Sequence, residues 1–278
     1  MPHKSYILNL KSIILLLSTI YFFSFASSVN ADITTGLVGH WKLDEASSGS
    51  TPTTAADSSG NNNNGTLTNG PTWTTGKIGS GAVSFDGVNK LVTTSDIAAL
   101  DSLSAFTVSA WVKFDTLANN QTIAGKFAGT VGLLFQTRDD SDIACAFDGS
   151  NFINSNNNAL VAGVWQHIVG TFDNSLGTGK HKIYFNAILQ PTLDFNSPDT
   201  VTSTGASTGS FEIGDNNTLD RFLDGSIDEV RVYNRALSAF DITELYNYTS
   251  GVADTTPPVL SGGSPTGTLS AGTTQTTL

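Results

Sequence analysis

Apolar and polar residues alternate along several short segments of this chain. The clearest segment runs from Phe106 to Phe114, in which every second residue is apolar. A period of two places alternate side chains on opposite faces of a β-strand. We therefore expect residues 106–114 to form a strand with one face against a core, and Trp111 to lie on the other face.

Further segments have the length and composition of strands. Residues 132–136 and 143–147 predict one hairpin, residues 165–172 and 182–186 predict a second, and residues 211–214 and 227–233 predict two later strands. No helical pattern alternates with these segments, which favours a two-sheet sandwich or jelly roll. One short helix is expected near the end, because Ser238 and Asp241 can form a capping box before Ile242 and Leu245.

The first 31 residues have the pattern of a signal peptide. Lys4 and Lys11 are followed by an uncharged apolar run, and the run ends at Val29-Asn30-Ala31, which suits a signal peptidase. We expect cleavage there and a secreted chain beginning at Asp32. A retained membrane anchor is the alternative, since about 20 apolar residues span a bilayer. The remaining chain has no second apolar run of that length, so no membrane contact is expected after cleavage.

The charge of the chain is strongly acidic. It contains 13 Lys and Arg against 24 Asp and Glu, a net charge of −11, and loss of residues 1–31 would make this −13. Such a balance excludes a typical nucleic-acid-binding protein, which carries basic patches. It equally argues against binding to anionic membrane surfaces.

Cysteine and histidine offer little chemistry. Cys145 is the single cysteine, so no disulfide can form within one chain, and its flanking alanines indicate a small buried residue. His40, His167 and His181 are too far apart in sequence for a typical metal-ligand spacing.

The composition changes near residue 254. After Asp254 come two threonines and two prolines, residues 255–258, and then a Gly-, Ser- and Thr-rich stretch up to residue 278. Adjacent prolines mark a linker. The stretch resembles the opening of a bacterial immunoglobulin-like repeat, and a disordered tail is the alternative. We therefore expect a patterned domain over residues 32–253 in a longer exported protein.

Seven motifs in order carry a family resemblance over residues 36–248. They are GLVGHWKLDE, DSSGNNNNGTL, GSGAVSFDGVNKLVTT, FTVSAWVKF, GVWQHIVGTFD, KIYFNA and FLDGSIDEVRVYNRALSAFDITELY. Together they resemble a laminin G-like domain of the concanavalin A-like superfamily. The resemblance implies an all-β, antiparallel jelly-roll sandwich of two sheets, which agrees with the alternation pattern.

The resemblance also implies a structural calcium ion near the first and last strands. The matching carboxylates are Asp57, Asp86 and Asp228, and calcium takes six to eight oxygen ligands of this kind. The alternative is that Asp57 caps an Asn-rich turn and that Asp228 pairs with an arginine. Glu229 is expected to be the partner of an arginine and not a base.

Tryptophans are candidates for stacking on sugars. The resemblance indicates packing roles for Trp41, Trp111 and Trp165, whereas Trp73 stands in a predicted loop and is our ligand-binding candidate. His167 is expected to pack or to form hydrogen bonds.

Three functions compete. The first is a non-catalytic extracellular module that binds carbohydrate or a cell-surface protein, the second is a structural spacer in an adhesin or surface-layer protein, and the third is a glycoside hydrolase. Glycosidases need two carboxyl groups on either side of the scissile bond. No two glutamates lie close in sequence, and Asp228 and Glu229 are expected on opposite faces of one strand. We therefore favour binding, with no catalytic residues.

Overall fold

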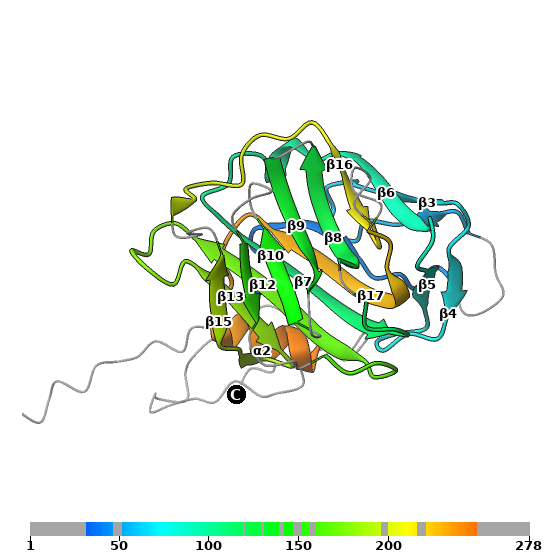
Figure 1. Cartoon of the computed structure of the whole chain (residues 1–278). Coiled ribbons are helices and arrows are strands. Elements are labelled where there is room, and N and C mark those ends of the chain that lie inside the picture. The colour runs from blue at the N-terminus through cyan, green and yellow to red at the C-terminus, as the bar shows by residue number, and fades with distance from the viewer. Residues whose placement is uncertain are drawn as a thin grey trace, which may run out of the picture. The chain divides into compact units, whose positions relative to one another are not determined.

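The computed structural model describes residues 32–46, 52–118, 120–128, 131–138, 142–146, 152–155, 160–195, 200–215 and 221–248. The predicted signal peptide and the predicted linker after residue 253 lie outside these residues. Two antiparallel sheets hold nearly all of the regular secondary structure of the described chain, together with one short α-helix (Figure 1). The predicted all-β jelly-roll sandwich is confirmed.

The first sheet has eight strands in the order β14-β13-β12-β7-β17-β5-β4, and β1 pairs with β17 beside β5. Its strands are β1 (Leu37–Trp41), β4 (Thr72–Thr74), β5 (Ala82–Asp86), β7 (Ala105–Phe114), β12 (Gln166–Asp173), β13 (His181–Phe185), β14 (Ile188–Leu189) and β17 (Asp224–Tyr233).

The second sheet has nine strands in the order β15-β11-β10-β9-β8-β16-β6-β3-β2. Its strands are β2 (Thr54–Ala55), β3 (Gly65–Thr68), β6 (Leu91–Asp96), β8 (Thr122–Ala128), β9 (Val131–Arg138), β10 (Asp142–Ala146), β11 (Phe152–Ser155), β15 (Thr192–Phe195) and β16 (Ser210–Ile213).

The alternation in β7 places its apolar residues as predicted. Phe106, Val108 and Phe114 all belong to the core cluster between the sheets, with at most 1 % of their surface exposed. Burying side chains of this size contributes about 1.5–3 kcal/mol each relative to exposure. The pattern of β7 therefore fixes which face of the first sheet meets the second.

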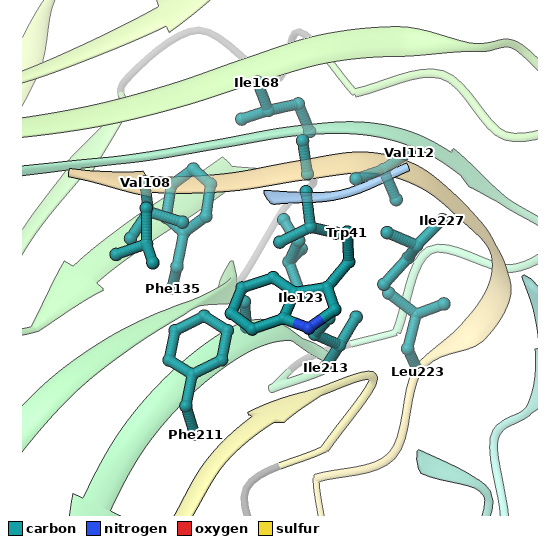
Figure 2. Packing of buried hydrophobic residues seen from close by; sticks show 14 of the residues in the cluster. Trp41, Val108, Val112, Ile123, Phe135, Ile168, Phe211, Ile213, Leu223 and Ile227 are labelled. Carbon is teal, nitrogen blue, oxygen red and sulfur yellow. The ribbon is translucent and has the colours of Figure 1, made fainter. Parts of the chain in front are cut away.

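Trp41 joins the two sheets. Its ring stacks on Phe211 of β16, with centroids 5.0 Å apart and planes at 11° (Figure 2). Its indole N–H donates to the carbonyl of Asn63. A Cβ on Gly39 would lie 2.4 Å from the Trp41 ring, so a glycine is needed for the indole to lie across β1.

The long strand β17 changes partners halfway along one edge. Residues 224–227 pair with β5, whereas residues 230–233 pair with β1. A register shift against β7 falls between Asp228 and Arg231, and Glu229 has a left-handed backbone with φ of 52°. This β-bulge sets the directions of the Asp228 and Glu229 side chains.

Helix α2 (Ala239–Asn247) covers the outer face of the first sheet. Ser238 and Asp241 form the predicted capping box at its start. Ile242 and Leu245 pack with Tyr233, and Val169 of β12 and Tyr184 of β13 belong to the same cluster. A short 3₁₀ turn, η1 (Ala98–Leu100), follows β6.

Candidate functional site

A pocket of about 340 Å³ opens beside the first residues of β1. Three other segments complete its wall, namely the turn at 61–63, the end of β6 with η1, and the residue after β17. Its polar lining residues are Asn61, Asn63, Asp96 and Asn234. All except the half-buried Asn63 are exposed.

The Asn-rich turn is attached to the free edge of β1. The side-chain amide of Asn61 donates to the carbonyls of Leu37 and Val38, both at 3.0 Å, and that of Asn63 donates to Val38 at 2.8 Å. These bonds give the Leu37 and Val38 carbonyls hydrogen-bond partners from the turn. Consequently the turn forms one side of the pocket.

Asp57 organises this turn. Its carboxylate accepts backbone N–H groups of His40, Ser59 and Asn63 at 2.8–3.0 Å, and the Ser59 hydroxyl at 2.8 Å. Burial raises the pKa of Asp57, but these hydrogen bonds outweigh burial and hold the pKa below its usual value. These contacts agree with the alternative stated above, in which Asp57 caps the Asn-rich turn.

Gly36 and Asn234 form the opposite side of the pocket. Gly36 has φ of 75°, and a Cβ there would lie 2.8 Å from Oδ1 of Asn234. The backbone N–H of Asn234 donates to the carbonyl of Gly36. Glycine thus permits the close approach that brings Asn234 to the pocket.

Asp96 is the only carboxylate among the lining residues. It forms an ion pair with Lys126, whose Nζ lies 2.8 Å away. Lys126 is buried and also contacts Asp101. One paired carboxylate can accept hydrogen bonds from hydroxyl groups, but it does not supply the two carboxyl groups that glycoside hydrolysis uses.

Trp73 is a correction to the sequence prediction. It lies in β4 and not in a loop, it is 4 % exposed, and its indole N–H donates to the carbonyl of Pro52. Because the ring belongs to the core cluster, it has no free face for stacking on a sugar.

The three aspartates predicted to bind calcium do not converge. Asp86 is exposed at the end of β5, where it contacts the N–H of Val88 and the side chain of Lys90. In β17 the residue paired with Asp86 is Asp224. Asp228 is buried and lies four residues further along β17, away from Asp86. Asp57 is engaged in the turn. Among the described residues, no three His, Cys, Asp or Glu side chains are arranged to hold a metal ion, so this set does not fit calcium as a shared ligand set.

Asp228 nevertheless has an unusual environment. Its Oδ2 accepts the N–H groups of Lys77 and Ile78 at 2.8 and 2.9 Å, whereas its buried Oδ1 has no hydrogen-bond partner. Burial, aided by the nearby charges of Glu229 and Asp44, raises the pKa of Asp228 to about 8. The unpartnered Oδ1 is the one observation that favours a proton or a cation at this carboxylate.

Glu229 pairs with basic groups, as predicted. Its Oε2 lies 2.7 Å from Nε2 of His40 and 2.8 Å from Nη2 of Arg231, and all three side chains are buried. Burial lowers the pKa of His40, although the hydrogen bond to Glu229 opposes this effect. A carboxylate so enclosed has no route to a substrate.

His167 and Trp111 also have packing roles. Nε2 of His167 lies 2.8 Å from the Ser109 hydroxyl, and burial, followed by the charge of Arg231, lowers the pKa of His167 to about 3. Trp111 lies on the outer face of the first sheet, between His167 and Tyr246. The buried Cys145 thiol has a raised pKa because of burial, which makes it a poor nucleophile.

The sequence matches a family model described as the concanavalin A-like lectin/glucanases superfamily, over residues 85–243. With the two-sheet fold and the motifs above, this match establishes that the chain belongs to the laminin G-like family of that superfamily. No curated protein matches the sequence.

Several solved structures share the fold. Domain 4 of AbnA, a GH43 extracellular arabinanase from Geobacillus stearothermophilus solved in complex with arabinotriose, has a TM-score of 0.59 and 26 % identity, and the match covers 76 % of this chain and 98 % of that one. The receptor binding domain of botulinum neurotoxin C/D mosaic serotype has a TM-score of 0.57 and 16 % identity, with 77 % and 52 % covered. A Trypanosoma rangeli sialidase has a TM-score of 0.54 and 15 % identity, with 76 % and 32 % covered.

This chain thus spans about half of the neurotoxin domain and a third of the sialidase. At such low identity these two likenesses show the fold alone. Within the described residues, no helix has the length and apolar character required to cross a membrane.

Proposed function

We propose that this chain is a non-catalytic recognition module that binds a glycan in the pocket beside β1. The observation that carries the proposal is the pocket itself, which three asparagines and one aspartate line from three separate segments. Binding sites for small ligands are concave and contain a few well-placed polar groups among apolar ones. An amide group can donate to and accept from sugar hydroxyls, whereas a carboxylate can only accept. Because the side-chain N–H groups of Asn61 and Asn63 already donate to β1 carbonyls, Asn234 is the candidate donor.

The likeness to domain 4 of the arabinanase supports a saccharide ligand, because that domain was solved with arabinotriose and nearly all of it is covered by the match. The contacts of the carboxylates support the absence of catalysis. Asp96 pairs with Lys126, and Glu229 is enclosed by His40 and Arg231. A structural spacer would bind no ligand in this pocket. The binding experiment below therefore distinguishes a recognition module from a spacer.

The proposal includes export. Removal of residues 1–31 would release a module of residues 32–253, at the cell surface or outside the cell, as part of a longer protein. The signal-peptide pattern described above motivates this part of the proposal.

The test is binding of arabinotriose and of a glycan array to purified protein. Asn234→Ala should weaken binding about tenfold, because one or two hydrogen bonds worth about 1 kcal/mol each are lost. Ala98→Phe should abolish binding by filling the pocket. Asn247→Ala is the matched control, since Asn247 is exposed on α2 and does not line the pocket.

Two outcomes would contradict the proposal. The first is an array with no bound glycan. The second is a bound glycan whose affinity is the same in Ala98→Phe as in the wild type, because the ligand would then occupy another surface.

A further inference from the structure

The asparagine turn beside β1 uses its amide donors within the protein. The side-chain amide of Asn61 donates to the carbonyls of Leu37 and Val38. The side-chain amide of Asn63 donates to Val38. A primary amide has two N–H donors and one oxygen that accepts. The N–H groups of Asn61 are thus committed to β1, and its amide oxygen is the polar atom left for a ligand.

Asp96 gives the pocket a negative charge. It is the last residue of β6, and its side chain is 42 % exposed. Its Oδ1 lies 2.8 Å from Nζ of Lys126, and the same ammonium also contacts Asp101. Two carboxylates therefore share one cation, and that cation is buried. Asp96 keeps exposed surface on which a second cation can bind.

Asp57 adds another negative charge close to the pocket wall. The ion pairs of the described residues do not include it, and its partners are backbone N–H groups and one hydroxyl. One of these N–H groups, at 2.8 Å, belongs to the lining residue Asn63. Despite burial, the hydrogen bonds keep the pKa of Asp57 below its usual value. The carboxylate is therefore ionised at neutral pH.

Arg235 does not offset this excess of negative charge. It follows the lining residue Asn234, but its Nε donates to the carbonyl of Thr35 at 2.8 Å and its Nη1 lies 3.0 Å from Asp241. Together with the groups above, the pocket wall and these direct contacts hold four carboxylates and two cations. A cleft with an excess of one sign of charge concentrates ligands of the opposite sign.

Small apolar residues form another part of the wall. Ala98 and Ala99 of η1 are exposed, and Leu37 is half-buried. Such a surface can pack against the C–H groups of a sugar ring, while the polar groups beside it fix the orientation of the ring. The volume of about 340 Å³ is at the lower end of the range for small-ligand sites, about 300–1,000 Å³. This size suits one end of an oligosaccharide.

We propose that the pocket beside β1 selects saccharides that carry a protonated amine, such as oligomers of glucosamine. This inference rests on the proposed function and adds the charge of the ligand to it. An ammonium group has three N–H donors and no acceptor, which complements a carboxylate and an amide oxygen. Asp96 binds the ammonium through a charge-assisted hydrogen bond, and the amide oxygen of Asn61 accepts a second one. The amide of Asn234 donates to a sugar oxygen.

The experiment compares two tetramers that differ at one position of each sugar. The β-1,4-linked glucosamine tetramer carries an amine where cellotetraose carries a hydroxyl. Binding of each tetramer to the purified protein is measured by calorimetry at about pH 6, where such an amine is protonated. The glucosamine tetramer should bind at least tenfold more tightly than cellotetraose. Ala98→Phe should abolish its binding, because the ligand occupies the pocket.

Asp96→Asn removes the charge with little change of shape. It should weaken binding of the glucosamine tetramer at least tenfold. Asp86→Asn is the matched control, because the Asp86 side chain is 40 % exposed, also pairs with a lysine and does not line the pocket. This control should stay within twofold of the wild type. Asp96→Glu keeps the charge and should bind more tightly than Asp96→Asn, and melting temperatures identify any variant that fails to fold.

Several results would overturn the inference. Equal affinity of the wild type for the two tetramers would remove the preference for an amine, and loss of that shared binding in Ala98→Phe would still leave the proposed function standing. Binding of the glucosamine tetramer that survives Ala98→Phe, or that Asp86→Asn weakens as much as Asp96→Asn does, would show general attraction to an acidic surface. Equal affinity for tetralysine would overturn the assignment to a saccharide. A protein that binds neither tetramer but binds a neutral glycan in the pocket would refute this inference alone.

Discussion

The protonation of Asp228 provides a quantitative test of the structure. Its pKa is raised from 3.8 to about 8, so the folded state holds a proton that the unfolded chain has lost. A raised folded-state pKa means that the associated stability is complete below the unfolded value and disappears as pH rises through the folded value. Raising the pH is therefore expected to destabilise the protein in calcium-free buffer.

The size of the effect follows from the two pKa values. Each unit of pKa difference corresponds to 1.36 kcal/mol. Between pH 7.0 and 8.5 the folded carboxyl passes from largely protonated to largely ionised, which removes about 1.3 kcal/mol of the free energy of unfolding. His40 and His167 have lowered pKa values. Their stabilising effect is thus lost as pH falls below about 6.5 and changes little in this window.

The assay is thermal unfolding in a chelator at both pH values, with Asp228→Asn as the matched variant. Asparagine has the same shape and can still accept the N–H groups of Lys77 and Ile78, but it does not titrate. Wild-type protein should lose about 3–5 °C in melting temperature relative to this variant, at about 2–4 °C per kcal/mol. Equal pH dependence of the two proteins would refute the argument, because Asp228 would then be ionised throughout.

Four further predictions concern other parts of the molecule. Calcium should leave the melting temperature of wild-type protein unchanged relative to chelator, because Asp57, Asp86 and Asp228 do not converge on one ion; a gain in calcium that Asp228→Asn lacks would contradict this expectation. Trp41→Ala should destabilise the protein by about 3–5 kcal/mol in denaturant unfolding, and a loss below 1 kcal/mol would contradict its place between the sheets. Purified protein should release no reducing ends from β-glucan or arabinan, and turnover that disappears in Glu229→Gln would reverse that conclusion. Sequencing of exported protein should begin at Asp32, whereas a membrane-bound chain that retains Met1 would disprove cleavage.

Local patterns predicted those features that depend on neighbouring residues. The alternation from Phe106 to Phe114 identified both faces of β7, and the spacing of Ser238 and Asp241 identified the start of α2. Each of these signals lies within one turn or one strand, where backbone geometry directly determines which side chains meet.

Features that depend on distant segments could not be read in the same way. Trp73 stands among turn-forming residues, yet its three-residue strand is held by pairing with β5. Asp57 meets its partner His40 across 17 residues of sequence, which no spacing rule connects. The Asn61 and Asn63 side chains resembled those of an ordinary solvated turn, because only the fold brings them beside Asn234.

The pairing of β1 with β17 affects how the chain must fold during synthesis. Strand β17 lies between β7 on one edge and β5 and β1 on the other. These three earlier strands therefore lack a pairing partner until residues 224–233 have been synthesised. The hydroxyl of Tyr233 also donates to the carbonyl of Ile33, across 200 residues of sequence. Such distant pairing slows folding, since the loop must close before the contact stabilises it. A nascent chain of this protein therefore stays open until almost the whole domain has been made, a state in which a polypeptide can still be threaded through a narrow channel.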